Sequence, residues 1–283
     1  MFKIVIDSRN DNKTLGEYIE TLAISVQRKK QLLNNNTCYI NKVLSSKEDI
    51  LKENDLLEID LSIFEIQKYK PVESNLTILY EDEYMIAIDK PSGYIVYDPE
   101  DVKVSICNLL RYYYKQYKRK CEIIPVHRLD SDTSGCLIFA KDIITAAYLS
   151  RSFENNEVIK KYVAKVSGVI NNEGTIDKNI GKDRHVNNKM VVCERGKKAL
   201  TKYRLISTNK KESLVEAIPV TGRTHQIRVH LASIGNPIVG DKTYGSKVNN
   251  NRILLHCQYI TFTHPIKEKT LTVYAPMPEE FKI

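Results

Sequence analysis

The 283-residue sequence contains no tryptophan and no apolar run near the roughly 18–20 residues that a membrane-spanning helix needs. Its first residues have neither a long apolar segment nor a small-residue cleavage site, so we expect no secretory signal. Cys-x-x-Cys pairs are also absent, and the six histidines lack ligand spacing with the cysteines, which argues against a zinc site. The cysteines lie mostly in apolar contexts, so we expect no disulfides and a cytoplasmic location.

The chain does have an excess of positive charge, and that charge is unevenly distributed. The net charge is +8, with a pI near 9.0 and a mean hydropathy of −0.35, which fits a soluble globular protein. Residues 1–66 hold nine basic and eleven acidic side chains, whereas residues 101–250 hold 27 basic and 14 acidic ones, a net of +13. A positive field over the second segment would attract a phosphate backbone, so nucleic acid is an expected partner. A lysine-rich composition with solvated side chains is the other interpretation.

The first 66 residues are predicted to form a small α/β domain. Apolar residues recur at helical spacing and predict an amphipathic helix over 14–23; they are Leu15, Ile19, Leu22 and Val26. A second helix is expected to begin near Ser25, a suitable N-cap, and to end at the three asparagines 34–36. Short strands are expected on either side of a polar loop, at 38–41 and 56–61.

Residues 67–75 are polar, contain a proline and show no apolar periodicity, so they are predicted to link the first domain to a larger one over 76–283. Helices are expected there at 104–117 and 143–154. Strands are expected at 76–80, 84–88, 136–140, 160–167, 199–206, 213–219 and 271–275. Strands outnumber regular β-α-β alternation, which favours the α+β class with a mixed, largely antiparallel sheet flanked by helices.

Residues 127–135, which read His-Arg-Leu-Asp-Ser-Asp-Thr-Ser-Gly, are the most informative segment. They place one carboxylate, Asp130, between the cation of Arg128 and a polar turn that ends at Gly135. An apolar run follows at 136–140, an order typical of a loop that enters a buried strand. A lone loop aspartate is most often a cap, so only the whole nonapeptide gives Asp130 a functional interpretation.

This nonapeptide resembles the motif of the RluA-type RNA pseudouridine synthases, which isomerise uridine in RNA. The resemblance implies that Asp130 is the catalytic carboxylate and that Arg128 inserts into the helical stack where the uridine leaves. It also implies RNA contacts for His127 and Thr133, whereas Asp132 is expected to make a turn hydrogen bond. An ion pair with a surface acid is the alternative role of Arg128.

Tyr162 follows Asp130 by 32 residues, in the segment Lys-Lys-Tyr-Val-Ala at 160–164. The sequence has 17 tyrosines, and one tyrosine in a strand is usually a packing residue. The segment nevertheless resembles the family's Lys-x-Tyr strand at that separation. The resemblance implies that Tyr162 stacks on the uracil and serves as, or positions, the base that removes the C5 proton.

Residues 221–232, Thr-Gly-Arg-Thr-His-Gln-Ile-Arg-Val-His-Leu-Ala, form a second strong motif. They predict a turn and then a helix whose apolar stripe is Ile227, Leu231 and Ile234. The segment resembles the family's Gly-Arg-Thr-His-Gln-(Ile/Leu)-Arg motif. This resemblance implies that Arg223 forms a salt bridge to Asp130, a role that the fixed fork of guanidinium donors suits.

The other polar residues of this motif have less specific roles. His225 and His230 are five residues apart, the wrong spacing for one helical face, so we expect hydrogen bonds or RNA contacts rather than a metal. Arg228 is expected to contact phosphate or to be a surface cation. Three further segments also resemble the family. Asp-Lys-Pro-Ser-Gly at 89–93 has a common turn geometry and is weak evidence by itself, whereas 196–203 and 254–256 are expected to be scaffold, with Lys197 and Lys198 as candidate backbone contacts.

The helix–helix–sheet order of the first domain resembles an S4-type RNA-binding domain, which implies RNA contacts for Arg28, Lys29 and Lys30. Two positions depart from that pattern. The usual glycine at the helix exit is Asn36, and the usual Asn-Gly after the first strand is Asn41-Lys42. Because the domain is also slightly acidic, packing without RNA binding is the alternative.

The resemblances together imply an RNA pseudouridine synthase whose larger domain is a curved sheet with a central basic cleft. No metal, cofactor or membrane partner is expected, and the expected state is a monomer. The S4-like domain favours large-subunit ribosomal RNA as the substrate, with tRNA as the alternative. Two other classes stay open: an RNA-binding or ribosome-assembly protein without the chemistry, and a hydrolase of another glycosidic bond. Most glycoside hydrolases use two carboxylates, for which Asp132 is the nearest second candidate.

Overall fold

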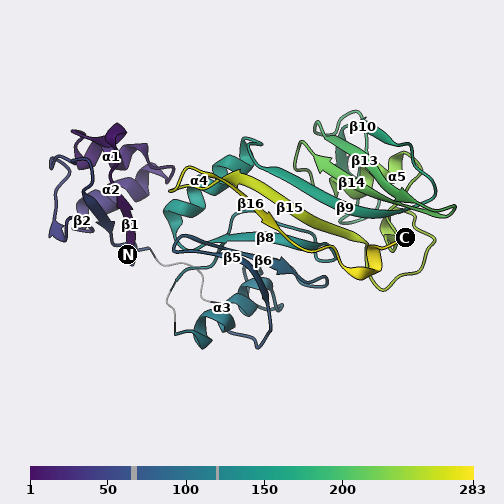
Figure 1. The fold of residues 1–283 in the computed structure, drawn as a ribbon, viewed down its shortest axis with the longest axis horizontal. Coiled ribbons are helices and arrows are strands. Elements are labelled where there is room, and N and C mark those ends of the chain that lie inside the picture. Colours follow the sequence, from purple (N-terminus) through teal and green to yellow (C-terminus); the bar gives the residue numbers. More distant parts are fainter. Residues whose placement is uncertain (65–68, 119–120) are drawn as a thin grey trace.

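The computed structural model describes residues 1–64, 69–118 and 121–283, and its strands form three sheets (Figure 1). One sheet of four strands lies near the N-terminus, the large sheet has ten strands, and two short strands form a separate pair. Residues 67 and 68 of the predicted linker lie outside the described residues. Tyr69, which follows them, is buried in the core of the large sheet, so this end of the segment is packed.

The N-terminal sheet is antiparallel, in the order β1-β4-β2-β3. Its strands are β1 (Phe2–Val5), β2 (Cys38–Ile40), β3 (Val43–Leu44) and β4 (Leu56–Ile59). Both predicted helices are confirmed, as α1 (Leu15–Thr21) and α2 (Val26–Asn34), and the Ser25 hydroxyl caps α2 by accepting from the Arg28 amide. Strand β1 was not predicted, because its place depends on pairing with β4 far along the chain.

The large sheet has the order β10-β13-β14-β9-β15-β8-β6-β5, with β16 beside β15 and β7 beside β8. Its strands are β5 (Thr77–Glu81), β6 (Met85–Lys90), β7 (Ile124–Pro125), β8 (Ser134–Ala140), β9 (Ile159–Ser167), β10 (Glu173–Asp177), β13 (Leu200–Thr208), β14 (Glu212–Pro219), β15 (Leu255–Thr263) and β16 (Thr270–Tyr274). The separate pair is β11 (Ile180–Lys182) with β12 (Met190–Val192). Among the described strand pairs only β8 with β15 is parallel, which confirms the mixed, largely antiparallel α+β prediction.

All seven strands predicted in the larger domain are present with shifted ends, but the sequence did not predict β15. That strand lies in the middle of the sheet, between β9 and β8, and begins within the segment 254–256, for which the sequence predicts only a scaffold role. Its place depends on partners that are distant in sequence, on both of its edges. A strand from near the C-terminus therefore separates the motif-bearing strands β8 and β9 and pairs with both.

Three helices belong to the larger part of the chain: α3 (Ile106–Gln116), α4 (Ile143–Glu154) and α5 (Gln226–Ser233). The Asp142 carboxylate caps α4 by accepting from the amides of Ile144 and Thr145. Short 3-10 turns are η1 (Ser8–Asn10), η2 (Lys242–Tyr244) and η3 (Glu279–Phe281). None of the helices within the described residues is long and apolar enough to cross a bilayer.

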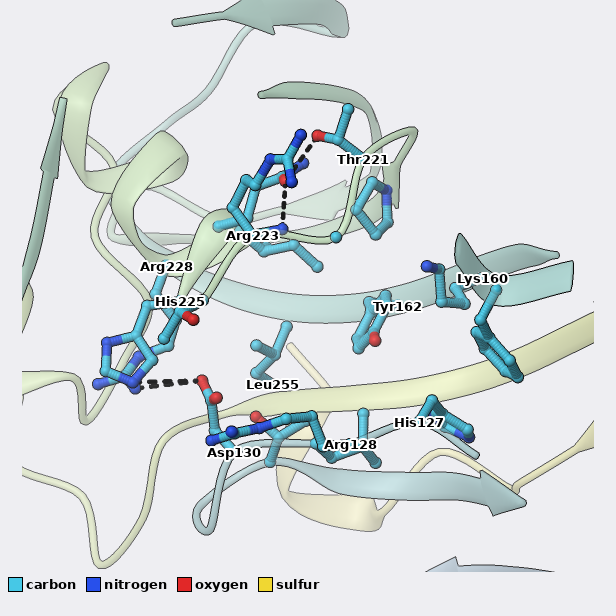
Figure 2. A pocket seen from close by; sticks show the side chains of 18 of the residues that line it. His127, Arg128, Asp130, Lys160, Tyr162, Thr221, Arg223, His225, Arg228 and Leu255 are labelled. Atoms are coloured by element: carbon cyan, nitrogen blue, oxygen red, sulfur yellow. Dashed lines mark hydrogen bonds and ion pairs between the residues drawn. The ribbon is translucent and has the colours of Figure 1, made fainter. Parts of the chain in front are cut away.

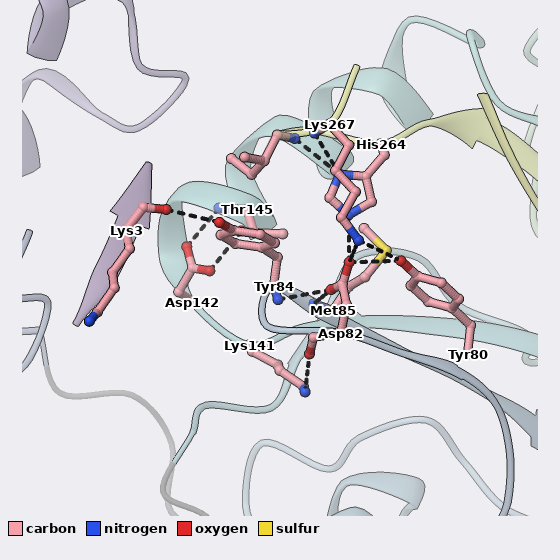
Figure 3. Close-up of polar contacts among 11 residues, drawn as sticks. Lys3, Tyr80, Asp82, Tyr84, Met85, Lys141, Asp142, Thr145, His264 and Lys267 are labelled. Carbon is pink, nitrogen blue, oxygen red and sulfur yellow. Dashed lines mark hydrogen bonds and ion pairs between the residues drawn. The ribbon is translucent and has the colours of Figure 1, made fainter. Parts of the chain in front are cut away.

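The N-terminal unit packs against α4 and against the turn before β6. Ile143 and Ile144 of α4 are buried in the same apolar cluster as the core of that unit. The Tyr84 hydroxyl donates to the Lys3 carbonyl at 2.9 Å (Figure 3), and Arg9 pairs with Glu268 at 2.6 Å. These contacts join the two parts at the end of the large sheet that lies away from α5 (Figure 1).

Candidate active site

A cavity of about 560 Å³ opens where the loop before β8, the end of α4, strand β9 and the turn before α5 meet. Asp130, Tyr162, Arg223, His225 and Arg228 of the sequence motifs are among the residues that line it (Figure 2). The fold therefore brings segments separated by about a hundred residues to one place, as the motif analysis expected.

The loop that carries Asp130 is held from behind by Lys90, the last residue of β6. Lys90 is fully buried, and its ammonium donates to the carbonyls of Ser131 and Thr133, both at 2.8 Å. The Thr133 amide in turn donates to the Asp130 carbonyl at 3.1 Å. Burial lowers the pKa of Lys90 to about 8, against the raising effect of Asp132 and Asp130. A buried ammonium group thus fixes the backbone of the turn after Asp130.

The rest of the Lys-Pro-Ser-Gly segment completes this clamp. The Ser92 hydroxyl donates to the Asp132 carbonyl at 2.8 Å, and the Gly93 amide donates to the Ser131 carbonyl at 2.9 Å. All three carbonyls of the loop 131–133 are therefore bound by residues 90–93. This segment therefore controls the backbone conformation next to Asp130.

The carboxylate of Asp130 is paired with Arg228 of α5. Arg228 Nη1 lies 3.3 Å from Asp130 Oδ2, while its Nε and Nη2 donate to the two oxygens of Asp241 at 2.7 and 3.0 Å. Asp241 is fully buried and Arg228 is 5% exposed. Burial opposes the charge of Arg228, but the Asp241 and Asp130 carboxylates outweigh it and raise its pKa. Asp241 thus fixes the guanidinium and leaves one edge of it for Asp130.

The prediction that Arg223 forms the salt bridge to Asp130 is wrong, because the arginine that pairs with Asp130 is Arg228. Arg223 is exposed in the turn before α5, where Figure 2 draws it apart from Asp130, and its Nε donates to the Lys198 carbonyl at 3.0 Å. Arg228 lies on the helix face that turns inward, so it reaches Asp130 instead. Both arginines lie in the recognised motif; the missing information was Asp241, in a segment that the sequence analysis did not single out.

His225 closes the same cluster from the N-cap of α5. Its backbone is left-handed, with a φ of 54°, and its Nδ1 lies 2.8 Å from the Tyr244 hydroxyl. Its Nε2 lies 3.8 Å from Asp130 Oδ2. Burial lowers the pKa of His225, although Asp130 acts in the opposite direction. His230 is fully buried and contacts the Thr201 hydroxyl and the Lys178 carbonyl, so the expected hydrogen-bonding role of this residue is confirmed.

Tyr162 lies on β9 in the wall of the cavity, next to Leu255 (Figure 2). Its side chain is 9% exposed, and burial raises its pKa well above the ordinary value of 10. The phenol is therefore neutral in the free protein at physiological pH. Stacking on a base is compatible with this position, whereas action as a base would require the phenol to lose its proton to a group that substrate binding brings.

The other residues predicted around Asp130 have different exposures. Arg128 is exposed at the mouth of the cavity, where Figure 2 draws it beside Asp130. Thr133 is 3% exposed. His127 accepts a hydrogen bond from the Ile138 amide at 3.1 Å, and its ring stacks on Phe153 at a centroid distance of 4.5 Å. Desolvation lowers the pKa of His127 to about 3, so the structure gives it a packing role.

The basic residues predicted on α2 are not brought to the cavity. Arg28 and Lys30 are exposed, with Arg28 5.7 Å from the Phe64 ring centroid, and the Lys29 ammonium donates to the Glu20 carbonyl. None of the three is among the cavity-lining residues. Figure 1 places α2 at the opposite end of the molecule from α5. Any RNA contact by these residues would be remote from Asp130.

Comparison with known proteins agrees with this geometry. A sequence profile of the family described as RNA pseudouridylate synthase matches residues 84–233. This range includes Asp130, Tyr162, His225 and Arg228, whereas Asp241 and Tyr244 lie beyond it. An uncharacterised RNA pseudouridine synthase of Bacillus subtilis, YhcT, is 35% identical over 99% of this chain and 95% of its own length. Ribosomal large subunit pseudouridine synthase C of Buchnera aphidicola is 38% identical over 74% of this chain and 69% of its own length.

Solved structures agree as well. Human RNA pseudouridylate synthase domain containing 1 superposes with a TM-score of 0.62 and 28% identity, over 71% of this chain and 83% of that chain. The human domain-containing 4 protein gives a TM-score of 0.61 at 27% identity. The chain therefore belongs to the RNA pseudouridine synthase family, and within it to the RluA type; it is an isomerase that acts on RNA.

Proposed function

We propose that this protein converts a uridine of large-subunit ribosomal RNA into pseudouridine, with Asp130 as the catalytic carboxylate. One observation carries the proposal: Asp130 lies in the cavity, paired with the buried Arg228 and close to Tyr162. Relatives that are named as ribosomal large subunit synthases support the substrate class. The N-terminal helix–helix–sheet unit, which resembles an S4-type domain, points the same way.

The proposed chemistry needs few groups. The N1–C1′ bond breaks, the base turns, and C5 bonds to C1′ with loss of the C5 proton. Asp130 supplies negative charge next to the sugar, and the cation of Arg228 stabilises that charge in a partly water-excluded site. Tyr162 presents its ring to the uracil. Lys90, which holds the backbone of the Asp130 loop, and Asp241, which fixes Arg228, are already in place before RNA binds.

The uridine has to leave its helix to reach Asp130, and unstacking costs roughly a few kcal/mol. Arg128 is exposed at the cavity mouth, and no hydrogen bond or ion pair occupies its guanidinium within the described part of the chain. We propose that the Arg128 side chain fills the gap that the uridine leaves in the RNA helix. A side chain held by a surface acid would be unsuited to that task, and Arg128 is not so held.

The test is release of tritium from RNA labelled as 5-³H-uridine and taken from cells that lack this gene. Wild-type protein should release label, because isomerisation must liberate the C5 hydrogen. Asp130→Asn should abolish release while RNA affinity stays within a few-fold. Asp132→Asn is the matched control, because it removes a carboxylate two residues away. Ser92 binds the backbone carbonyl of Asp132, which this substitution keeps. The variant should therefore keep most of the activity.

The outcomes separate the alternatives. Size fractionation of the RNA that releases label distinguishes ribosomal RNA from tRNA. Binding without release by wild-type protein, on both naked RNA and ribosomal precursors, would replace the proposal with the non-catalytic RNA-binding function. Free uracil as a product, together with loss of activity in Asp132→Asn, would instead indicate a two-carboxylate hydrolase.

A further inference from the structure

Lys160 places an ammonium group in the same cavity, two residues before Tyr162 on β9. Residues i and i+2 of a strand share a face, so both side chains point into the cavity. Figure 2 shows Lys160 on the side of Tyr162 that is away from Asp130. The cavity thus extends past Tyr162 into a second region, lined by Lys160, Phe153, Ser150 and Asn156.

The Lys160 ammonium has no acidic partner within the described residues. Its Nζ lies 5.7 Å from the centroid of the Phe153 ring, and no hydrogen bond or ion pair reaches it in that part of the chain. Glu154 lines the same cavity but is exposed and forms no ion pair with Lys160 there. Half-buried as it is, the Lys160 side chain loses hydration and keeps the Phe153 ring as a neighbour but no anion from the described residues, and this desolvation lowers its pKa.

The other lysines of β9 are paired. Lys161, on the opposite face, lies 3.8 Å from Glu216, and Lys165 lies 3.2 Å from Glu212. Among the lysines of β9, Lys160 is therefore the one whose charge is available to an anion outside the protein. A partly desolvated cation without a counter-ion attracts an anion more strongly than a solvated surface lysine does.

We propose that Lys160 binds a backbone phosphate of the RNA strand that delivers the uridine to Asp130. This assignment rests on the proposed function, because it takes the bound strand to be RNA. A phosphodiester carries one full negative charge, and no such charge among the described residues is paired with the Lys160 ammonium. The ammonium is a point charge with three hydrogen-bond donors, which suits the binding of phosphate oxygens. Gly222 leaves the approach open: a Cβ at that position would stand 3.9 Å from the Lys160 Nζ, so a larger side chain would cover the ammonium.

The geometry gives the contact a consequence for the reaction. With the sugar at Asp130 and the base against Tyr162, a phosphate held at Lys160 anchors the strand on the far side of the base. Such an anchor acts in the bound state and in the transition state alike. Its loss should therefore raise KM and weaken RNA binding, with a smaller effect on kcat.

The test compares Lys160→Gln with Lys161→Gln, two variants that remove the same charge from opposite faces of one strand. RNA affinity is measured over a range of salt concentrations in an Asp130→Asn background, with the same uridine-containing RNA used for tritium release. Lys160→Gln should reduce the slope of log K against log salt by roughly 0.7–0.9, the value for one lost phosphate contact. Lys161→Gln should leave the slope unchanged, and Lys160→Arg should restore most of it.

An unchanged slope in Lys160→Gln, or an equal change in both glutamine variants, would overturn the proposal. Tritium-release kinetics are measured with Lys160→Gln in the protein that keeps Asp130. A fall in kcat there, with an unchanged salt slope, would overturn the proposal too and would assign Lys160 to the uracil. If Lys160→Gln folds poorly, Lys160→Arg keeps the test decisive. It retains the positive charge in a different shape, so the slope of log K against log salt should stay close to that of the protein with Lys160. The proposed function fails separately, by absence of tritium release from wild-type protein, while the slope comparison can still be read.

Discussion

Arg228, rather than Arg223, is the cation at Asp130 because a buried acid fixes it there. Two of its nitrogens are held by Asp241, so the direction of the third is set before substrate arrives. The Tyr244 ring, 5.0 Å from the guanidinium carbon, covers one face of it. Asp241 touches neither Asp130 nor the space for the uridine, so it is a positioning residue whose effect passes through Arg228.

Removal of the Asp241 charge tests this. Asp241→Asn breaks a buried ion pair and should cost about 3 kcal/mol in the free energy of unfolding. It should also lower kcat by about 10²-fold, because a misplaced cation no longer stabilises the charge on Asp130. Denaturant unfolding and tritium-release kinetics measure the two effects. Glu280→Gln, which removes an acid from the more exposed pair with Arg252, is the control and should cost under about 1 kcal/mol. Unchanged kcat in Asp241→Asn would refute the positioning role.

His127 makes the stability of the protein depend on pH. Its folded pKa is about 3, lowered by desolvation, against about 6.5 in an unfolded chain. Between these values the unfolded state binds the extra proton, so stability is full above pH 6.5 and falls as pH decreases towards 3. The loss should reach about 2 kcal/mol at pH 5.

Urea unfolding from pH 7 to pH 4 measures this loss. His127→Gln, which keeps an acceptor for the Ile138 amide but does not titrate, should remove that part of the pH dependence. Parallel curves for the two proteins would show that the ring is already protonated in the fold, and the assignment of His127 as a neutral packing residue would be wrong.

At the scale of elements, the parallel contact of β8 with β15 fixes the position of the chain where the Asp130 loop enters β8. Gly135 lies opposite Cys257 in this contact with a φ of +107°, and a Cβ there would stand 2.2 Å from the Cys257 carbonyl oxygen. Only glycine allows β15 to come that close. The motif therefore ends in Gly because of a strand that lies more than a hundred residues away in sequence.

Gly135→Ala should cost about 3 kcal/mol or more, because backbone strain and a backbone clash add together. Gly93→Ala is the matched control: its φ is +94°, but nothing lies within 4 Å of the added Cβ. That variant should cost about 1–2 kcal/mol, the conformational part alone. Thermal unfolding measures both. If the two costs were equal, the close approach of β15 would contribute nothing.

At the scale of the whole molecule, the N-terminal unit is packed on α4 but its basic helix lies far from the cavity. The shared apolar cluster with Ile143 and Ile144, and the Tyr84–Lys3 hydrogen bond, hold the unit in place. A fixed unit can add a second, remote contact to a long RNA without touching the reacting uridine. It would then contribute to affinity and substrate choice, not to chemistry.

Replacement of Arg28, Lys29 and Lys30 by Gln should raise KM and reduce the salt slope of RNA binding by up to about 2, with kcat unchanged. The control replaces three exposed lysines of the same unit, Lys42, Lys47 and Lys52, by Gln. Salt-dependent binding and tritium-release kinetics on the same RNA provide the comparison. Equal slopes for wild type and the α2 variant would leave the unit with a packing role only.

Sequence alone determined the α+β class, most elements and the family, because these depend on local patterns: apolar periodicity, caps, turn residues and contiguous motifs. Asp130 and Tyr162 were predicted as site residues this way, since each lies in a short recognisable segment, and both line the cavity. The tertiary structure decided which arginine meets Asp130, that Lys90 clamps the loop after it, and that Lys160 has no counter-ion. These facts depend on Asp241, on β15 and on the spacing of side chains across the sheet. Pairings between segments distant in sequence are set by the packing of the whole chain, and no local pattern records them.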